Sequence, residues 1–164
     1  MLGDWVFGCS EIYSLNNLDS LQDIEIGNDC FGSVQSFQID GLNRLQSLKI
    51  GYNSFTQVKY NDFANDSDGS ISKCRNESKS FHILNCESLE SIQIGEYSFS
   101  DFAGEFALKN LPQLQSIQIG TIGSWSGNFY YSSFVIRGIE MILNIVMIRS
   151  SKSTIHYIRQ KCIL

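Results

Sequence analysis

The stretch LQSLKIGYNSF, residues 45–55, decides how this chain folds, because it is written several times along the sequence. It returns as LQDIEIGNDCF at 21–31, LESIQIGEYSF at 89–99 and LQSIQIG at 114–120. The apolar residues that precede the glycine are Leu2, Ile26, Ile50, Ile94 and Ile119. Their spacings are 24, 24, 44 and 25 residues, and a weaker sixth copy ends at Met147. Self-similarity at a period of this size is typical of repeat proteins.

The second half of each repeat is also written several times. Its copies are SFQIDGL at 36–42, SFHILNC at 80–86, EFALKNL at 105–111, SFVIRGI at 133–139 and, more loosely, IYSLNNL at 12–18. In the first half the apolar residues alternate with polar ones: Leu48 and Ile50 face one side of an extended segment, and Ser47 and Lys49 face the other. The second half alternates in the same way. The pattern predicts two short strands per repeat and little helix.

Stacking of the repeats would create the core. One repeat is too small to enclose its apolar side chains, and its backbone edges stay unpaired until a neighbour stacks on it. Phe7, Phe31, Phe55 and Phe99 recur after the first strand, and we expect them to stack inside. A β-sandwich would need alternation, but not the same apolar frame at a fixed spacing. We therefore predict an all-β repeat solenoid over residues 1–148, with about five repeats of about 24 residues.

The positions within one repeat resemble those of a known family. Leu45, Leu48, Ile50, Asn53 and Phe55 match the pattern L-x-x-L-x-I-x-x-N-x-F of leucine-rich repeats. The resemblance implies a leucine-rich-repeat horseshoe or a right-handed β-solenoid, in which the first strands line a concave face and the asparagine ties one turn to the next. The extended, Phe-rich second half is most similar to the BspA-like subfamily, which is found in bacterial and protist surface proteins.

Three features depart from the family's pattern. Asp29 and Tyr97 stand at the position of Asn53, so a continuous asparagine ladder is not expected. The chain has a single proline, Pro112. Only Cys86 matches the cysteine of the subfamily's repeat.

A first interruption of the repeat covers residues 59–80. This segment is polar and rich in Asn, Asp and Ser, which predicts an exposed insertion loop. It contains two N-glycosylation sequons, at Asn65 and Asn76, which matter only in a secreted chain. The letters DSDG at 66–69 are similar to part of a calcium loop, but Ala64 and Arg75 occupy the first and last ligand positions. We therefore predict a solvated loop without calcium.

A second interruption, residues 121–134, places aromatic residues in a Gly- and Ser-rich turn. Trp125, Phe129, Tyr130 and Tyr131 either anchor a partner or cover the core of the last repeat, and the sequence leaves both readings open. Residues 149–164 form an unpatterned tail. Because the chain begins in mid-repeat, we expect it to be part of a longer repeat protein, a truncated product, or a chain whose open end meets a partner.

Composition and charge disfavour several classes of function. The net charge of −5 and the pI near 4.9 disfavour nucleic-acid binding, which depends on clustered Lys and Arg. No apolar stretch is long enough to predict a transmembrane segment. The five cysteines contain no CxxC pair, and neither His82 nor His156 has a nucleophile and a carboxylate arranged for catalysis. We expect no enzyme activity, no metal and no cofactor, with His82 facing outwards and Cys86 filling a core position.

The outward row of the first strand in each repeat remains as a candidate site. Its partner-binding residues are predicted to be Asp23, Glu25, Ser47, Lys49, Tyr52, Ser91, Gln93, Glu96, Ser116 and Gln118. Serine and glutamine make this row flat, polar and nearly neutral. Such a face can bind a peptide, a protein or a glycan, or it can be a solvated face that binds nothing, and the sequence leaves both readings open. Glu25 and Lys49 are expected to be cross-strand neighbours.

These observations predict a non-enzymatic leucine-rich-repeat interaction module. It would bind a protein or peptide, with a glycan as a further candidate, through its concave strand face. The alternative is a structural spacer within a larger cell-surface or adhesive repeat protein. In a third hypothesis, the repeats are the recognition arm of an enzyme whose catalytic domain lies outside this chain. A longer BspA-like protein would be secreted or at the cell surface, and otherwise the chain would be cytoplasmic.

Overall fold

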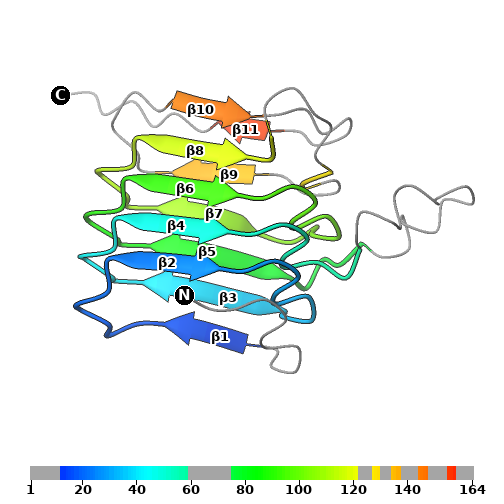
Figure 1. Ribbon diagram of the computed structural model, residues 1–164, viewed down its shortest axis with the longest axis horizontal. Coiled ribbons are helices and arrows are strands. Elements are labelled where there is room, and N and C mark those ends of the chain that lie inside the picture. Colours follow the sequence, from blue (N-terminus) through cyan, green and yellow to red (C-terminus); the bar gives the residue numbers. More distant parts are fainter. Residues whose placement is uncertain are drawn as a thin grey trace, which may run out of the picture.

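The chain forms two parallel β-sheets (Figure 1). The computed structural model describes residues 12–58, 75–121, 127–129, 134–137, 144–147 and 155–157, and no helix occurs among them. The strands are β1 (Ile12–Leu15), β2 (Asp23–Ile26), β3 (Ser36–Asp40), β4 (Ser47–Ile50), β5 (Ser80–Leu84), β6 (Ser91–Ile94), β7 (Phe106–Lys109), β8 (Ser116–Ile119), β9 (Phe134–Arg137), β10 (Asn144–Met147) and β11 (Ile155–Tyr157). The predicted all-β class is confirmed.

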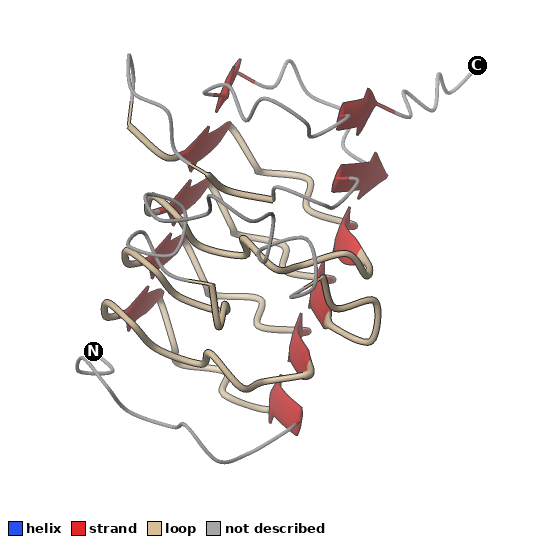
Figure 2. Cartoon of the chain, turned by 90° about the vertical axis from the view of Figure 1, so that its right-hand side faces the viewer, coloured by secondary structure: helices blue, strands red, loops and turns tan. Residues whose placement is uncertain are grey.

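Consecutive strands alternate between the two sheets. One sheet has the order β1-β3-β5-β7-β9-β11 and is called here the six-stranded sheet. The other has the order β10-β8-β6-β4-β2 and is called the five-stranded sheet. Parallel neighbours need a crossover connection, and each crossover contains a strand of the opposite sheet. Figure 2 shows the two sheets as separate rows of strands joined by loops.

The core lies between the sheets and follows the predicted alternation. In β4, Leu48 and Ile50 are buried while Lys49 is exposed, and in β3, Phe37 and Ile39 are buried. The register places like residues beside each other. In the five-stranded sheet the inner columns are Ile24, Leu48, Ile92, Ile117 and Ile26, Ile50, Ile94, Ile119. Burial of each such side chain stabilises the fold by roughly 1.5–3 kcal/mol.

Phenylalanine rings form two internal columns. In the turn after the five-stranded sheet, Phe31 stacks on Phe55 at 5.0 Å between ring centroids, Phe55 on Phe99 at 4.9 Å, and Phe99 on Phe129 at 4.9 Å. The second column consists of Phe37, Phe81 and Phe106. Rings of the two columns meet edge to face, the arrangement that aromatic quadrupoles favour. The predicted column is confirmed from Phe31 to Phe99, and Phe7 lies outside the described residues.

Left-handed backbone recurs in the described turns that follow β1 to β7. After the six-stranded sheet the residues with positive φ are Asn17, Gly41, Asn85 and Asn110. Asparagine and glycine suit this conformation. After the five-stranded sheet Phe31, Phe55 and Phe99 also have φ between 56° and 59°, an uncommon conformation for a bulky side chain. Ring stacking in the core offsets the cost of this conformation.

Glycine at the end of β4 and β6 lets neighbouring backbones approach closely. A Cβ atom on Gly95 would lie 2.6 Å from the carbonyl carbon of Gly51, closer than real Cβ atoms come to backbone. The Gly95 N–H donates to the Ile50 carbonyl at 2.8 Å and extends the ladder beyond the strand. At Gly51 and Gly95 the glycine is therefore a packing requirement.

Hydrogen bonds from buried side chains tie each repeat to the preceding one. Ser54 Oγ donates to the Gly27 carbonyl at 2.9 Å, and Ser98 Oγ donates to the Gly51 carbonyl at 2.7 Å. In the next repeat Asn128 Nδ2 donates to the Gly95 carbonyl at 2.7 Å.

The resemblance to leucine-rich repeats predicts that Asn53, one residue before Ser54, ties one turn to the next. Asn53 is buried and its backbone N–H donates to the Glu96 carbonyl at 3.0 Å. The serine hydroxyls at the following position add a side-chain tie that the family pattern did not predict.

The structure adds detail to three predicted segments. Residues 75–80, assigned to the exposed loop 59–80, join the body of the fold: Lys79 is buried and Ser80 begins β5. Within the predicted insertion 121–134, Phe129 is a core residue, whereas Trp125, Tyr130 and Tyr131 lie outside the described residues. The tail 149–164 contains β11, which pairs with β9 in parallel.

Candidate interaction surface

The predicted partner-binding residues do share one face. On the outer side of the five-stranded sheet, parallel pairing aligns two columns across four strands. These are Asp23, Ser47, Ser91, Ser116 and Glu25, Lys49, Gln93, Gln118. The remaining two candidates, Tyr52 and Glu96, lie in the turns that follow β4 and β6. We call this set the outer polar face.

The half of the outer polar face on β2 and β4 is paired internally. Ser47 Oγ donates to Asp23 Oδ1 at 2.5 Å, and Lys49 Nζ lies 3.0 Å from Glu25 Oε1. The predicted Glu25–Lys49 contact is therefore confirmed. Their side chains are 42% and 58% exposed, so solvent screens the pair and it contributes on the order of 1 kcal/mol or less. Its main effect is on strand register.

The strand side chains of the half on β6 and β8 make fewer internal contacts. Within the described ranges the side chains of Ser91, Gln93 and Ser116 have no hydrogen-bond partner or ion pair, and Gln118 makes one long contact, 3.4 Å, to the Gly120 carbonyl. Gln93 sits between Lys49 and Gln118 in register. Uncompensated amide and hydroxyl groups at the surface can exchange water for a partner's polar groups.

Tyr52 lies at the edge of the outer polar face. Tyr52 meets Tyr97 edge to face, with ring centroids 5.8 Å apart. Its backbone N–H donates to Asn28 Oδ1 at 2.9 Å, which fixes the turn after β4. Tyr52 is half-buried, so it offers a partner only part of its ring.

The opposite sheet carries a polar network that was not predicted. Asn110 Nδ2 donates to Asn85 Oδ1 at 2.7 Å, and Asn85 Nδ2 donates to Asp40 Oδ1 at 2.9 Å. Asn85 and Asn110 occupy the left-handed turn position that follows the six-stranded sheet. The sequence signal for this network is the asparagine that recurs at the same repeat position, in LNC at 84–86 and KNL at 109–111. A left-handed position favours Asn or Gly.

A short charged cluster lies on the same sheet. Glu105 Oε1 accepts from Lys109 Nζ at 3.2 Å, and Glu105 Oε2 lies 3.3 Å from His82 Nε2. The hydrogen bond from Lys109 is the main cause that lowers the pKa of Glu105 below its ordinary value. His82 points outwards as expected but is only 24% exposed.

Cys86 fills a core position, as predicted. Its side chain is fully buried, and burial raises the pKa of the thiol. A thiol kept protonated is a poor nucleophile. The part of the chain with described side chains holds no group of three or more His, Cys, Asp and Glu residues that could bind a metal.

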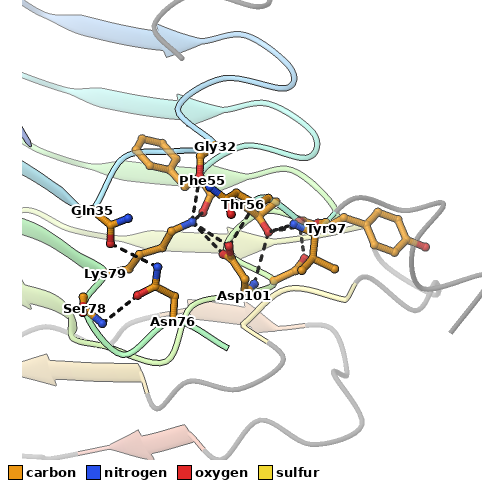
Figure 3. Close-up of polar contacts among 12 residues, drawn as sticks. Gly32, Gln35, Phe55, Thr56, Asn76, Ser78, Lys79, Tyr97 and Asp101 are labelled. Carbon is orange, nitrogen blue, oxygen red and sulfur yellow. Dashed lines mark hydrogen bonds and ion pairs between the residues drawn. The ribbon is translucent and has the colours of Figure 1, made fainter. Parts of the chain in front are cut away.

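One buried ion pair was missed entirely. Lys79 Nζ lies 2.9 Å from Asp101 Oδ2 and 3.0 Å from Oδ1, with both side chains out of solvent (Figure 3). The same nitrogen donates to the carbonyls of Gly32 and Phe55. The sequence does not mark Lys79 as a buried residue, because it lies at the end of a polar insertion.

No helix within the described ranges has the length and apolar character to cross a membrane. No protein-family model, curated protein or solved structure matches this chain.

Proposed function

We propose that the chain is a leucine-rich-repeat β-solenoid that acts, without catalysis, as an interaction module for an extended protein or peptide segment. The partner would lie across the outer polar face and make its polar contacts with the β6–β8 half. The observation that carries this proposal is the contrast within one aligned face. The side chains on β2 and β4 are paired with one another, while Ser91, Gln93 and Ser116 have no partner among the described residues.

Register favours an extended partner. Neighbouring strands lie about 4.8 Å apart, so the Ser and Gln columns repeat amide and hydroxyl groups at a regular interval across the sheet. A segment lying across the strands would meet the same pair of groups at each step. This arrangement supports polar recognition of a backbone more than recognition of one large side chain.

A peptide-display selection against the purified chain tests the proposal. Binders isolated from a random library should lose about tenfold or more in affinity on Gln93→Arg, as expected for a central interface position. Gln113→Arg is the matched control, because Gln113 is also exposed but lies in the turn before β8. Binders that tolerate Gln93→Arg, or that are lost only with Gln113→Arg, would place recognition elsewhere.

A structural spacer is the second candidate. The internally paired β2–β4 half supports it, because a face that satisfies its own groups has little to offer a partner. Glycosylation at Asn76 would favour a secreted spacer. The Asn76 amide nitrogen, to which the glycan would be attached, already donates a hydrogen bond to Gln35 Oε1 at 3.3 Å. Selection that yields no binder to either half of the outer polar face would favour the spacer.

A further inference from the structure

The Lys79–Asp101 pair is buried, unlike the other ion pairs of lysine and arginine among the described residues. The side chains are 0% and 2% exposed, whereas the other Lys and Arg ion pairs of the described residues lie at the surface. Burying two charges carries a large desolvation penalty. Neutralising the pair by a covalent bond would remove that penalty.

The surroundings of Lys79 Nζ direct it at the carboxyl group. An ammonium has three N–H donors. Acceptors for two of them are the carbonyl oxygens of Gly32 at 3.0 Å and Phe55 at 3.3 Å, and the third faces Asp101. If that third proton passes to the carboxylate, the lone pair of the resulting amine faces the carboxylic acid.

The surroundings of Asp101 suit attack at its carboxyl carbon. Lys79 Nζ is almost equidistant from Oδ1 and Oδ2, at 3.0 and 2.9 Å, so the nitrogen contacts both oxygens of the carboxyl group it would attack. The Gln57 backbone N–H donates to Oδ2 at 3.1 Å and would stabilise negative charge on that oxygen in a tetrahedral intermediate. Holding both groups at contact distance in a site closed to solvent supplies the proximity that such a condensation needs.

We propose that Lys79 and Asp101 condense after folding to form an intramolecular isopeptide bond. The Lys79 Nζ–Asp101 Cγ bond forms and one Cγ–O bond breaks. Of the three ammonium protons, one neutralises the carboxylate, one leaves with the hydroxyl as water, and one stays on the amide nitrogen. The amide N–H then donates to one of the two carbonyls that held the ammonium. No oxidant, reductant or cofactor is required.

The bond would fasten the strand that follows the insertion to the next repeat. Asn76 already pairs there, with its N–H donating to the Asp101 carbonyl at 2.8 Å and its carbonyl accepting from the Ala103 N–H at 3.0 Å. Gly104 packs so tightly on this segment that a Cβ would lie 1.8 Å from the Lys79 carbonyl oxygen. The covalent link joins residues that are 22 apart in sequence, across two neighbouring repeats.

Intact mass spectrometry of the full chain tests the proposal. The folded protein, analysed in denaturant, should be lighter than its sequence mass by one water, and proteolysis should release a branched peptide that joins the Lys79 and Asp101 segments. Lys79→Arg, which keeps the charge but removes the attacking amine, should have its full mass. Chain held in denaturant from synthesis should also have its full mass.

Two outcomes would overturn the proposal. Folded native chain that keeps its full mass, with Lys79 and Asp101 on separate linear peptides, would show that the pair remains ionic. Loss of water in Lys79→Arg as well would place the dehydration at another residue, such as an Asp-Gly step at 40–41 or 68–69.

Discussion

At the scale of single residues, hydrogen bonds from buried side chains join neighbouring repeats. The hydroxyl of Ser98 illustrates this: it accepts from the Ser54 N–H at 3.0 Å and donates to the Gly51 carbonyl at 2.7 Å, and both serines are fully buried. A buried N–H that loses its acceptor is costly because water cannot replace it.

Ser98→Ala should therefore lower the free energy of unfolding by about 1–3 kcal/mol, measured by urea denaturation. Ser91→Ala is the matched control, since its hydroxyl lies on the outer polar face without a partner among the described residues. That variant should change stability by less than about 0.5 kcal/mol. Equal effects from the two substitutions would contradict the assignment of the inter-repeat tie to Ser98.

Gly95→Ala should destabilise the fold through backbone crowding. Its new methyl group would lie within 2.7 Å of the Gly51 carbonyl, so neighbouring repeats would have to move apart at a cost of about 1–3 kcal/mol. Gly41→Asn is a control with open space around the Cβ position, and asparagine already occupies the equivalent left-handed position at Asn85 and Asn110. Thermal denaturation should show a clear loss for the first variant and little change for the second.

At the scale of elements, the two sheets differ in what their outer faces do. On the five-stranded sheet Ser91, Gln93 and Ser116 have no side-chain partner among the described residues. The six-stranded sheet instead joins its polar side chains to one another through Asp40, Asn85 and Asn110. The outer faces of the two sheets therefore differ in how far their polar side chains are paired within the chain.

The pH dependence of the six-stranded sheet follows from Glu105. Its pKa is lowered from 4.5, first by the hydrogen bond from Lys109, so the interaction contributes fully above the unfolded pKa and is lost as the pH falls through the lower folded value. Because Glu105 is half exposed, the contribution to stability is small and screened by salt. An NMR titration of the Glu105 carboxyl carbon should have a midpoint below 4.5 that rises in Lys109→Met. A midpoint at or above 4.5 in the native chain would contradict this contact.

At the scale of the whole molecule, the sequence predicts the strands of the repeats, their alternation and the members of the outer polar face, but it does not predict β11 in the tail. Those features depend on local letters, such as Leu48 and Ile50 beside Lys49, whose period sets the buried side. The sequence does not predict contacts between segments that lie outside the repeated pattern. Lys79 and Asp101 pair across a long insertion. For Phe129 the sequence left two readings open, and the structure places this residue in the core.

The parallel register of the five-stranded sheet is the claim on which the outer polar face depends. Interstrand nuclear Overhauser effects measured on the isotope-labelled chain test it most directly. The account predicts contacts that place Gln93 between Lys49 and Gln118 in a parallel arrangement. Antiparallel contacts, or a shift of one residue that turns Ile92 and Ile94 outwards, would contradict it.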